Sequence, residues 1–184
     1  MFVTWLVQLI SLFFSFYIMH IPFFFQGTNN IKAIVLDQKE NFSKCRADGF
    51  SNMRNLGLLI LYHTNFSGNF NFLSNNLRYL SWYGYPFTGA TNLQYLDSTS
   101  LFTIHESIGA LAKLKFLSFR NCINLVEIPN SVKSITSLVT LDFYGCLKLT
   151  TLPLQWTYSS HMRSLIFLDL NFCNLHEDRM VLQR

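Results

Sequence analysis

The sequence predicts an α/β fold in which short parallel strands line a concave face and loops, 3-10 turns and short helices line a convex face. The main observation is a repeat between Lys113 and Pro153. In it, Leu114 and Leu138, and likewise Cys122 and Cys146, lie 24 positions apart. In addition, half of the 184 residues are apolar and only 13% are charged. A chain of this length and composition can bury a sizeable core.

The repeated unit fits the pattern L-x-x-L-x-L-x-x-N/C-x-L of a leucine-rich repeat. Well-defined units begin at Leu114, Leu138 and Leu165, and less regular ones at Ile31, Leu56 and Leu77. One such unit cannot bury its apolar stripe without neighbours, so the units are expected to stack into a solenoid. Three parallel strands centred on Leu117, Leu141 and Leu168 should then lie side by side.

The convex side of each unit is expected to carry a short helical or 3-10 turn. The segments ESIGALAKL and NSVKSITSL have this character. Each turn should direct one apolar side chain inward, two residues after Glu106 in the first and two residues after Asn130 in the second.

The repeats are predicted to span 27–175, followed by a tail over 176–184. Their spacing is irregular near 84–104, because Leu77 and Leu93 are only 16 residues apart. Sixteen residues cannot form a strand, a turn and a return path. The sequence therefore predicts a deletion that interrupts the stack and leaves two halves that unfold separately.

The N-terminal segment, residues 1–26, is strongly apolar, and Phe2–Phe25 contains no charged residue. As a helix it would be about 36 Å long, enough to cross a hydrocarbon core of roughly 30 Å. Residues 1–25 are therefore expected to form a membrane anchor, with a mispredicted first exon and a cleaved signal as the alternatives. Five Lys and Arg residues between Lys32 and Arg54 favour a cytoplasmic location for the rest of the chain.

The sequence predicts no catalytic, cofactor-binding or metal-binding residue. Cys122, Cys146 and Cys173 occupy one position in successive units, where we expect buried thiols in a row rather than a tetrahedral zinc site. Unpaired thiols point to a reducing compartment. The net charge of +4 is spread thinly, so a nucleic-acid surface is not expected, and no enzymatic motif is present.

The candidate partner-binding residues are those at outward strand positions, because stacked parallel strands present them on one concave surface. Aromatic and arginine side chains are common at binding hot spots. The alternative is that Phe116 and Phe167 only cover neighbouring units. The candidates are Tyr79, Tyr83, Phe116, Arg120, Asp142, Tyr144, Phe167 and Asp169.

Three blocks resemble the leucine-rich-repeat region of plant TIR-type nucleotide-binding disease-resistance proteins. They are IKAIVLD with GFSNMRNLGLLILY, then LSNNLRYLSWYGYPF, then HESIGALAKLKFLSFRNCINLVEIPNSV. The resemblance covers about Gly27 to Leu175. It implies a non-enzymatic protein-interaction module for pathogen recognition and defence signalling. The implied partner is an effector, a guarded host protein or another receptor domain.

The sequence also departs from this family. It contains no G-x-x-x-x-G-K-[ST] loop and no TIR domain. We therefore expect a truncated receptor on the cytoplasmic face, without nucleotide switching or NAD cleavage. The alternatives are a membrane-anchored or secreted receptor-like repeat protein and a non-functional truncated product. Secreted plant repeats usually carry a Gly-x-Ile-Pro turn, whereas the turns here read Val-Glu-Ile-Pro and Thr-Thr-Leu-Pro. Secretion is therefore disfavoured.

Overall fold

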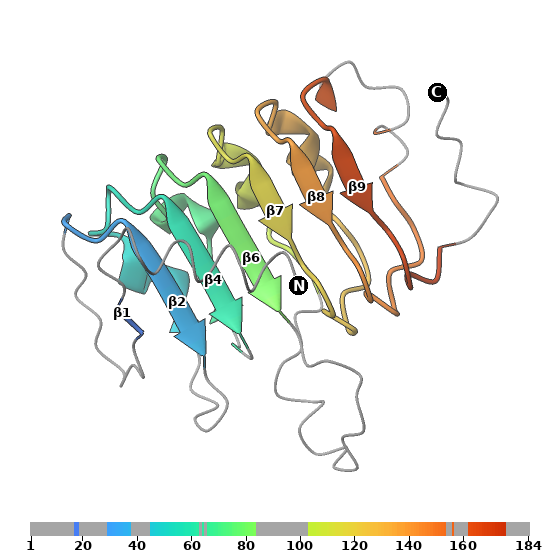
Figure 1. Cartoon of the computed structure of the whole chain (residues 1–184), viewed down its shortest axis with the longest axis horizontal. Coiled ribbons are helices and arrows are strands. Elements are labelled where there is room, and N and C mark those ends of the chain that lie inside the picture. The colour runs from blue at the N-terminus through green and yellow to red at the C-terminus, as the bar shows by residue number, and fades with distance from the viewer. Residues whose placement is uncertain are drawn as a thin grey trace, which may run out of the picture.

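The computed structural model contains one large parallel β-sheet (Figure 1). Within the described residues the sheet has seven strands, ordered β1-β2-β4-β6-β7-β8-β9. They are β1 (Tyr17–Ile18), β2 (Ala33–Asp37), β4 (Leu58–Tyr62), β6 (Tyr79–Tyr83), β7 (Phe116–Ser118), β8 (Thr140–Asp142) and β9 (Phe167–Asp169). The structure describes residues 17–18, 29–37, 45–62, 64, 66–83, 103–153, 156 and 162–175.

The inner face of the sheet is a continuous apolar core. Leu80, Leu117, Leu141 and Leu168 are consecutive partners in the strand register, and the first three are at most 1% exposed. The predicted side-by-side parallel strands centred on the last three leucines are therefore confirmed. The leucine interval sets the register because a slip of one residue would turn every leucine to the outer face.

Aromatic side chains form a second row of this core. Phe119 stacks on Phe143 with ring centroids 5.6 Å apart, and Trp82 stacks on Phe119 at 6.2 Å. Phe66 meets the edge of Trp82 at 4.8 Å. These rings join successive units, so each unit depends on its neighbours for burial.

Short 3-10 helices cover the core on the side opposite the sheet (Figure 1). The turns predicted after Glu106 and Asn130 are confirmed, and Ile108 and Val132 are fully buried beneath them. Gly109 lets two of these helices approach closely, because a Cβ there would lie 2.6 Å from a backbone oxygen of η5. The helices are η1 (Ala47–Phe50), η2 (Phe70–Phe72), η4 (Glu106–Ala110) and η5 (Asn130–Ser134). A two-stranded parallel sheet, β3 (Cys45–Arg46) with β5 (Phe66–Ser67), adjoins η1.

The sheet is not interrupted where the repeat spacing fails. Strand β6 pairs directly and in register with β7, although 37 residues separate Leu80 from its partner Leu117. The backbone amide of Phe70 also donates to the hydroxyl of Ser107 at 2.8 Å, which joins the two sides of the gap. The prediction that the stack is interrupted here is therefore wrong, because β6 and β7 are paired neighbours in the sheet despite the irregular spacing between them. Residues 84–102 themselves lie outside the described residues.

The predicted N-terminal helix is not supported where it can be examined. Tyr17 and Ile18 form a β-strand parallel to β2, and the other residues of 1–26 lie outside the described part. The predicted tail over 176–184 also lies outside it. In the ranges that the structure describes, no helix has the length and apolar character required to span a bilayer.

Candidate functional site

The outer face of the sheet carries the candidate residues, and two of them form a tight aromatic pair. Tyr79 of β6 and Phe116 of β7 are register partners, and their rings stack at 4.2 Å with an interplanar angle of 3°. Burial raises the pKa of Tyr79 above its ordinary value. Phe116 thus covers its neighbour on the adjacent strand while remaining partly exposed.

A second aromatic pair lies at the far ends of β4 and β6. Tyr62 stacks on Tyr83 at 4.8 Å. Burial raises the pKa of Tyr62 to about 12, with smaller contributions from Tyr83 and the charge of Asp37. Burial likewise raises the pKa of Tyr83. Tyr62 was not among the predicted site residues, although its position one unit before Tyr83 was a usable signal.

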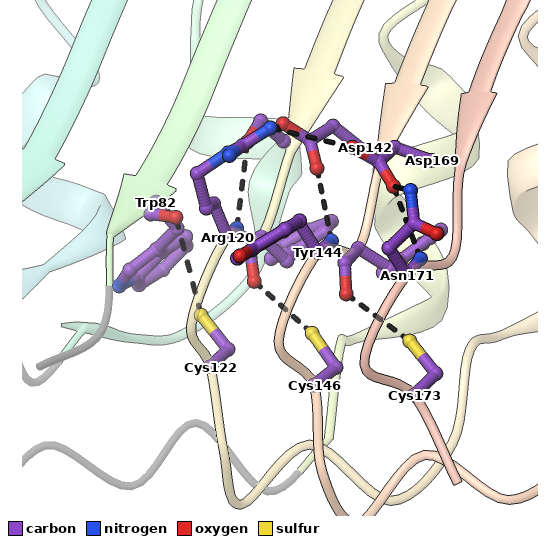
Figure 2. A network of polar contacts seen from close by, with 12 residues as sticks. Trp82, Arg120, Cys122, Asp142, Tyr144, Cys146, Asp169, Asn171 and Cys173 are labelled. Carbon is purple, nitrogen blue, oxygen red and sulfur yellow. Dashed lines mark hydrogen bonds and ion pairs between the residues drawn. The ribbon is translucent and has the colours of Figure 1, made fainter. Parts of the chain in front are cut away.

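Arg120 links three successive units across the outer face (Figure 2). Its Nε donates to Asp142 Oδ2 at 3.0 Å, and its Nη2 donates to Asp169 Oδ2 at 3.4 Å. The guanidinium also lies 4.4 Å from the ring centroid of Tyr144, within the range of a cation–π interaction. One side chain thereby fixes the relative positions of three strand ends.

Asp142 and Asp169, two of the candidate residues, are held by hydrogen bonds within the sheet. They are only 5% and 8% exposed. Each accepts, through Oδ1, the backbone N–H two residues later, from Tyr144 at 2.9 Å and from Asn171 at 3.0 Å. This local hydrogen bond turns the chain at the strand end. Both predicted binding carboxylates are thus engaged within the sheet, and little of either side chain is exposed to a partner.

Phe172 adds an exposed aromatic ring beside Tyr144, with which it makes an edge-to-face contact at 5.0 Å. It is 66% exposed and has a positive φ of 60°. The corresponding positions of the two preceding units hold Asn121 and Gly145, which tolerate this backbone better. A bulky side chain held in such a conformation costs energy.

The predicted patch is only partly assembled. Arg120 and Tyr144 are in contact, whereas Phe116 contacts Tyr79 instead. Phe167 is 50% exposed and is separated from Phe116 by Thr140, its register partner on β8. The patch is thus two aromatic clusters with an exposed ring beyond them.

The three repeat cysteines form the expected row (Figure 2). Cys146 Sγ donates to the Phe119 carbonyl at 3.1 Å, and Cys173 Sγ donates to the Phe143 carbonyl at 3.2 Å. A hydrogen bond with Cys173, together with burial, raises the pKa of Cys146. Among the described residues, no group of His, Cys, Asp and Glu could hold a metal ion. The thiols serve as backbone donors between units.

These features define an α/β protein with a parallel sheet whose outer face displays paired aromatic rings and one arginine. Aromatic and arginine side chains of this kind are common where proteins contact other macromolecules. No family model matches the chain, and no curated protein is significantly similar to it.

Proposed function

We propose that this protein is a leucine-rich-repeat solenoid and a non-enzymatic protein-interaction module. In this proposal it corresponds to the recognition region of a plant intracellular immune receptor of the TIR type. The support is the in-register leucine ladder, since Leu117, Leu141 and Leu168 follow the repeat pattern and pair strand by strand. The partner would be an effector, a guarded host protein or another receptor domain.

The observation that carries the interaction role is the arrangement of the outer face. Tyr79 and Phe116 form one aromatic platform, and Arg120 with Tyr144 forms a second. Rigid aromatic pairs lose little conformational entropy on binding, so they are efficient contact residues. Phe167 and Phe172 extend this surface, and large exposed aromatic rings of this kind are typical of interfaces.

The proposed location is the cytoplasmic side. In support, Cys45, Cys122, Cys146 and Cys173 form no disulfide bond, which fits a reducing compartment. A secreted or membrane-anchored receptor-like protein and a non-functional product are the competing proposals.

The test is site-specific photo-crosslinking of the full chain in plant cells. A benzophenone amino acid replaces Phe116 on the outer face or, as the matched control, Phe72, a 45% exposed phenylalanine on η2. We expect a discrete adduct from the first position only. The crosslinked protein is then identified, purified and titrated against the chain by calorimetry.

The proposal predicts that the double variant Phe116→Ala with Tyr144→Ala binds this partner about tenfold or more weakly. Phe72→Ala should bind as the unmodified chain does. Crosslinking from Phe72 but not Phe116, or equal affinity of the double variant, would place the interaction on another face.

A further inference from the structure

A pocket of about 510 Å³ lies where β2, β4 and β6 begin. Two cations, two amides, a tyrosine and small apolar groups line it, and none of the lining residues is acidic. The lining residues are Lys32, Ala33, Asn55, Gly57, Leu58, Asn76, Arg78 and Tyr79.

The sheet register creates this basic site from residues far apart in the sequence. Leu58 N donates to Lys32 O at 3.2 Å, Tyr79 N to Gly57 O at 3.1 Å and Phe116 N to Arg78 O at 3.1 Å. The residues immediately before β2, β4, β6 and β7 therefore form one row across the sheet. They are Lys32, Gly57, Arg78 and Lys115. Because neighbouring strands are about 4.8 Å apart, the first two cations flank the glycine with roughly 10 Å between their backbones.

The cations of this row are available to a ligand. Lys32 and Arg78 are both exposed, and among the residues that the structure describes neither has an ion-pair partner. A further cation outside this row, Lys113, is held beside the pocket because its Nζ donates to Asn76 Oδ1 at 2.9 Å. The uncompensated positive charge favours an anion.

The other lining residues indicate what kind of anion the pocket fits. Tyr79 and Leu58 give the pocket apolar sides, which fit the methylene stem of an acidic side chain. Tyr79 is also half of the aromatic platform with Phe116, so the pocket is continuous with the outer face. We propose that the pocket holds the carboxylate of an acidic segment of a protein partner. This inference rests on the proposed protein-binding function and names the chemistry of one part of the contact.

The test measures binding of rhodamine-labelled hexaglutamate to the full chain by fluorescence anisotropy at about 0.1 M salt, where the Debye length is about 10 Å, with labelled hexaglutamine as the uncharged control. Because each exposed charge contributes a few-fold to affinity, the double variant Lys32→Ala with Arg78→Ala should bind hexaglutamate about tenfold more weakly. The control variant Lys148→Ala with Arg163→Ala loses the same net charge elsewhere. It should change affinity less than about twofold, because charges beyond a Debye length are screened.

A third variant, Gly57→Leu, blocks the pocket while keeping every charge. A Cβ at this position would be 3.7 Å from the nearest oxygen, an ordinary van der Waals contact, so a side chain can be added beside the two cations. We expect it to weaken hexaglutamate binding as the double charge variant does, with an unchanged circular dichroism spectrum.

Equal binding by Gly57→Leu and the unmodified chain, or equal losses in both double charge variants, would show that hexaglutamate does not bind in this pocket. Stronger competition by inorganic phosphate or an oligothymidylate than by free hexaglutamate would overturn the carboxylate assignment in favour of a phosphate group. The peptide assay reports on the charges of Lys32 and Arg78, whereas the crosslinking test reports on contact at Phe116. Failure of this peptide assay is therefore distinguishable from failure of the crosslinking test at the aromatic platform.

Discussion

Removing the Arg120 guanidinium should destabilise the sheet by about 2 kcal/mol. Arg120 contacts two buried carboxylates, Asp142 at 3.0 Å and Asp169 at 3.4 Å. Breaking a fully buried pair costs about 3–5 kcal/mol, because one charge is left without compensation. The Arg120 side chain is 31% exposed, so water replaces part of its effect and the expected loss is about half of that range.

The variant Arg120→Met keeps most of the side-chain volume and removes the charge. Urea unfolding of the full chain, followed by circular dichroism, gives the loss directly. For a chain of this size, about 2 kcal/mol corresponds to a fall in Tm of about 4–8 °C. Loss of the contact with Tyr144 is included in this figure, because a partly exposed cation–π interaction contributes only about 0.5–1 kcal/mol.

A double-mutant cycle assigns the loss to the carboxylates. The variant Asp142→Asn retains an Oδ1 that accepts the backbone hydrogen bond. In this background, Arg120→Met should reduce the free energy of unfolding by at least 1 kcal/mol less than in the unmodified chain, because such couplings are ~1–2 kcal/mol. Asp169→Asn should recover less, because its contact is longer. Stability of Arg120→Met within about 0.5 kcal/mol of the unmodified chain, or an equal loss in both backgrounds, would refute the role of Arg120 as a clamp.

Three further outcomes follow from the structure. Since β6 pairs with β7, the calorimetric and van't Hoff enthalpies of unfolding should agree for the full chain. A van't Hoff enthalpy well below the calorimetric one, in a chain that remains monomeric, would instead show separate unfolding units. Leu117→Ala, at a fully buried site, should cost about 2–5 kcal/mol in urea unfolding, and half-exposed Phe167→Ala less than about 1 kcal/mol; similar losses would contradict the assigned faces. The pKa of Tyr62 is raised from 10.0 to about 12, so the unfolded chain ionises first and stability should fall as pH rises through this window; an unchanged alkaline stability curve in Tyr62→Phe would contradict it.

The aromatic ring of Phe172 separates stability from binding. Its φ of 60° is unfavourable for a bulky residue, so Phe172→Gly should leave the chain as stable or more stable. The same change should weaken binding of the partner found by crosslinking. A marked loss of stability, measured by urea unfolding, would show instead that the ring packs as part of the fold.

The sequence by itself determined the core and the register of the C-terminal strands. An inward leucine placed once per unit can be buried only if units stack with these leucines side by side, so the intervals ending at Leu117, Leu141 and Leu168 required parallel pairing. The cysteine row and the inward residues Ile108 and Val132 followed from the same repeat.

Only the tertiary structure decided which outward residues remain available and what lies beside them. Asp142 and Asp169 occupy outward positions, yet Arg120 and their own turns engage them, because alternation gives a side chain's direction and not its partners. Lys32 and Arg78 flank one pocket because hydrogen bonds between strands bring together residues from separate units. Likewise, the direct pairing of β6 with β7 could not be read from a spacing that had lost its period.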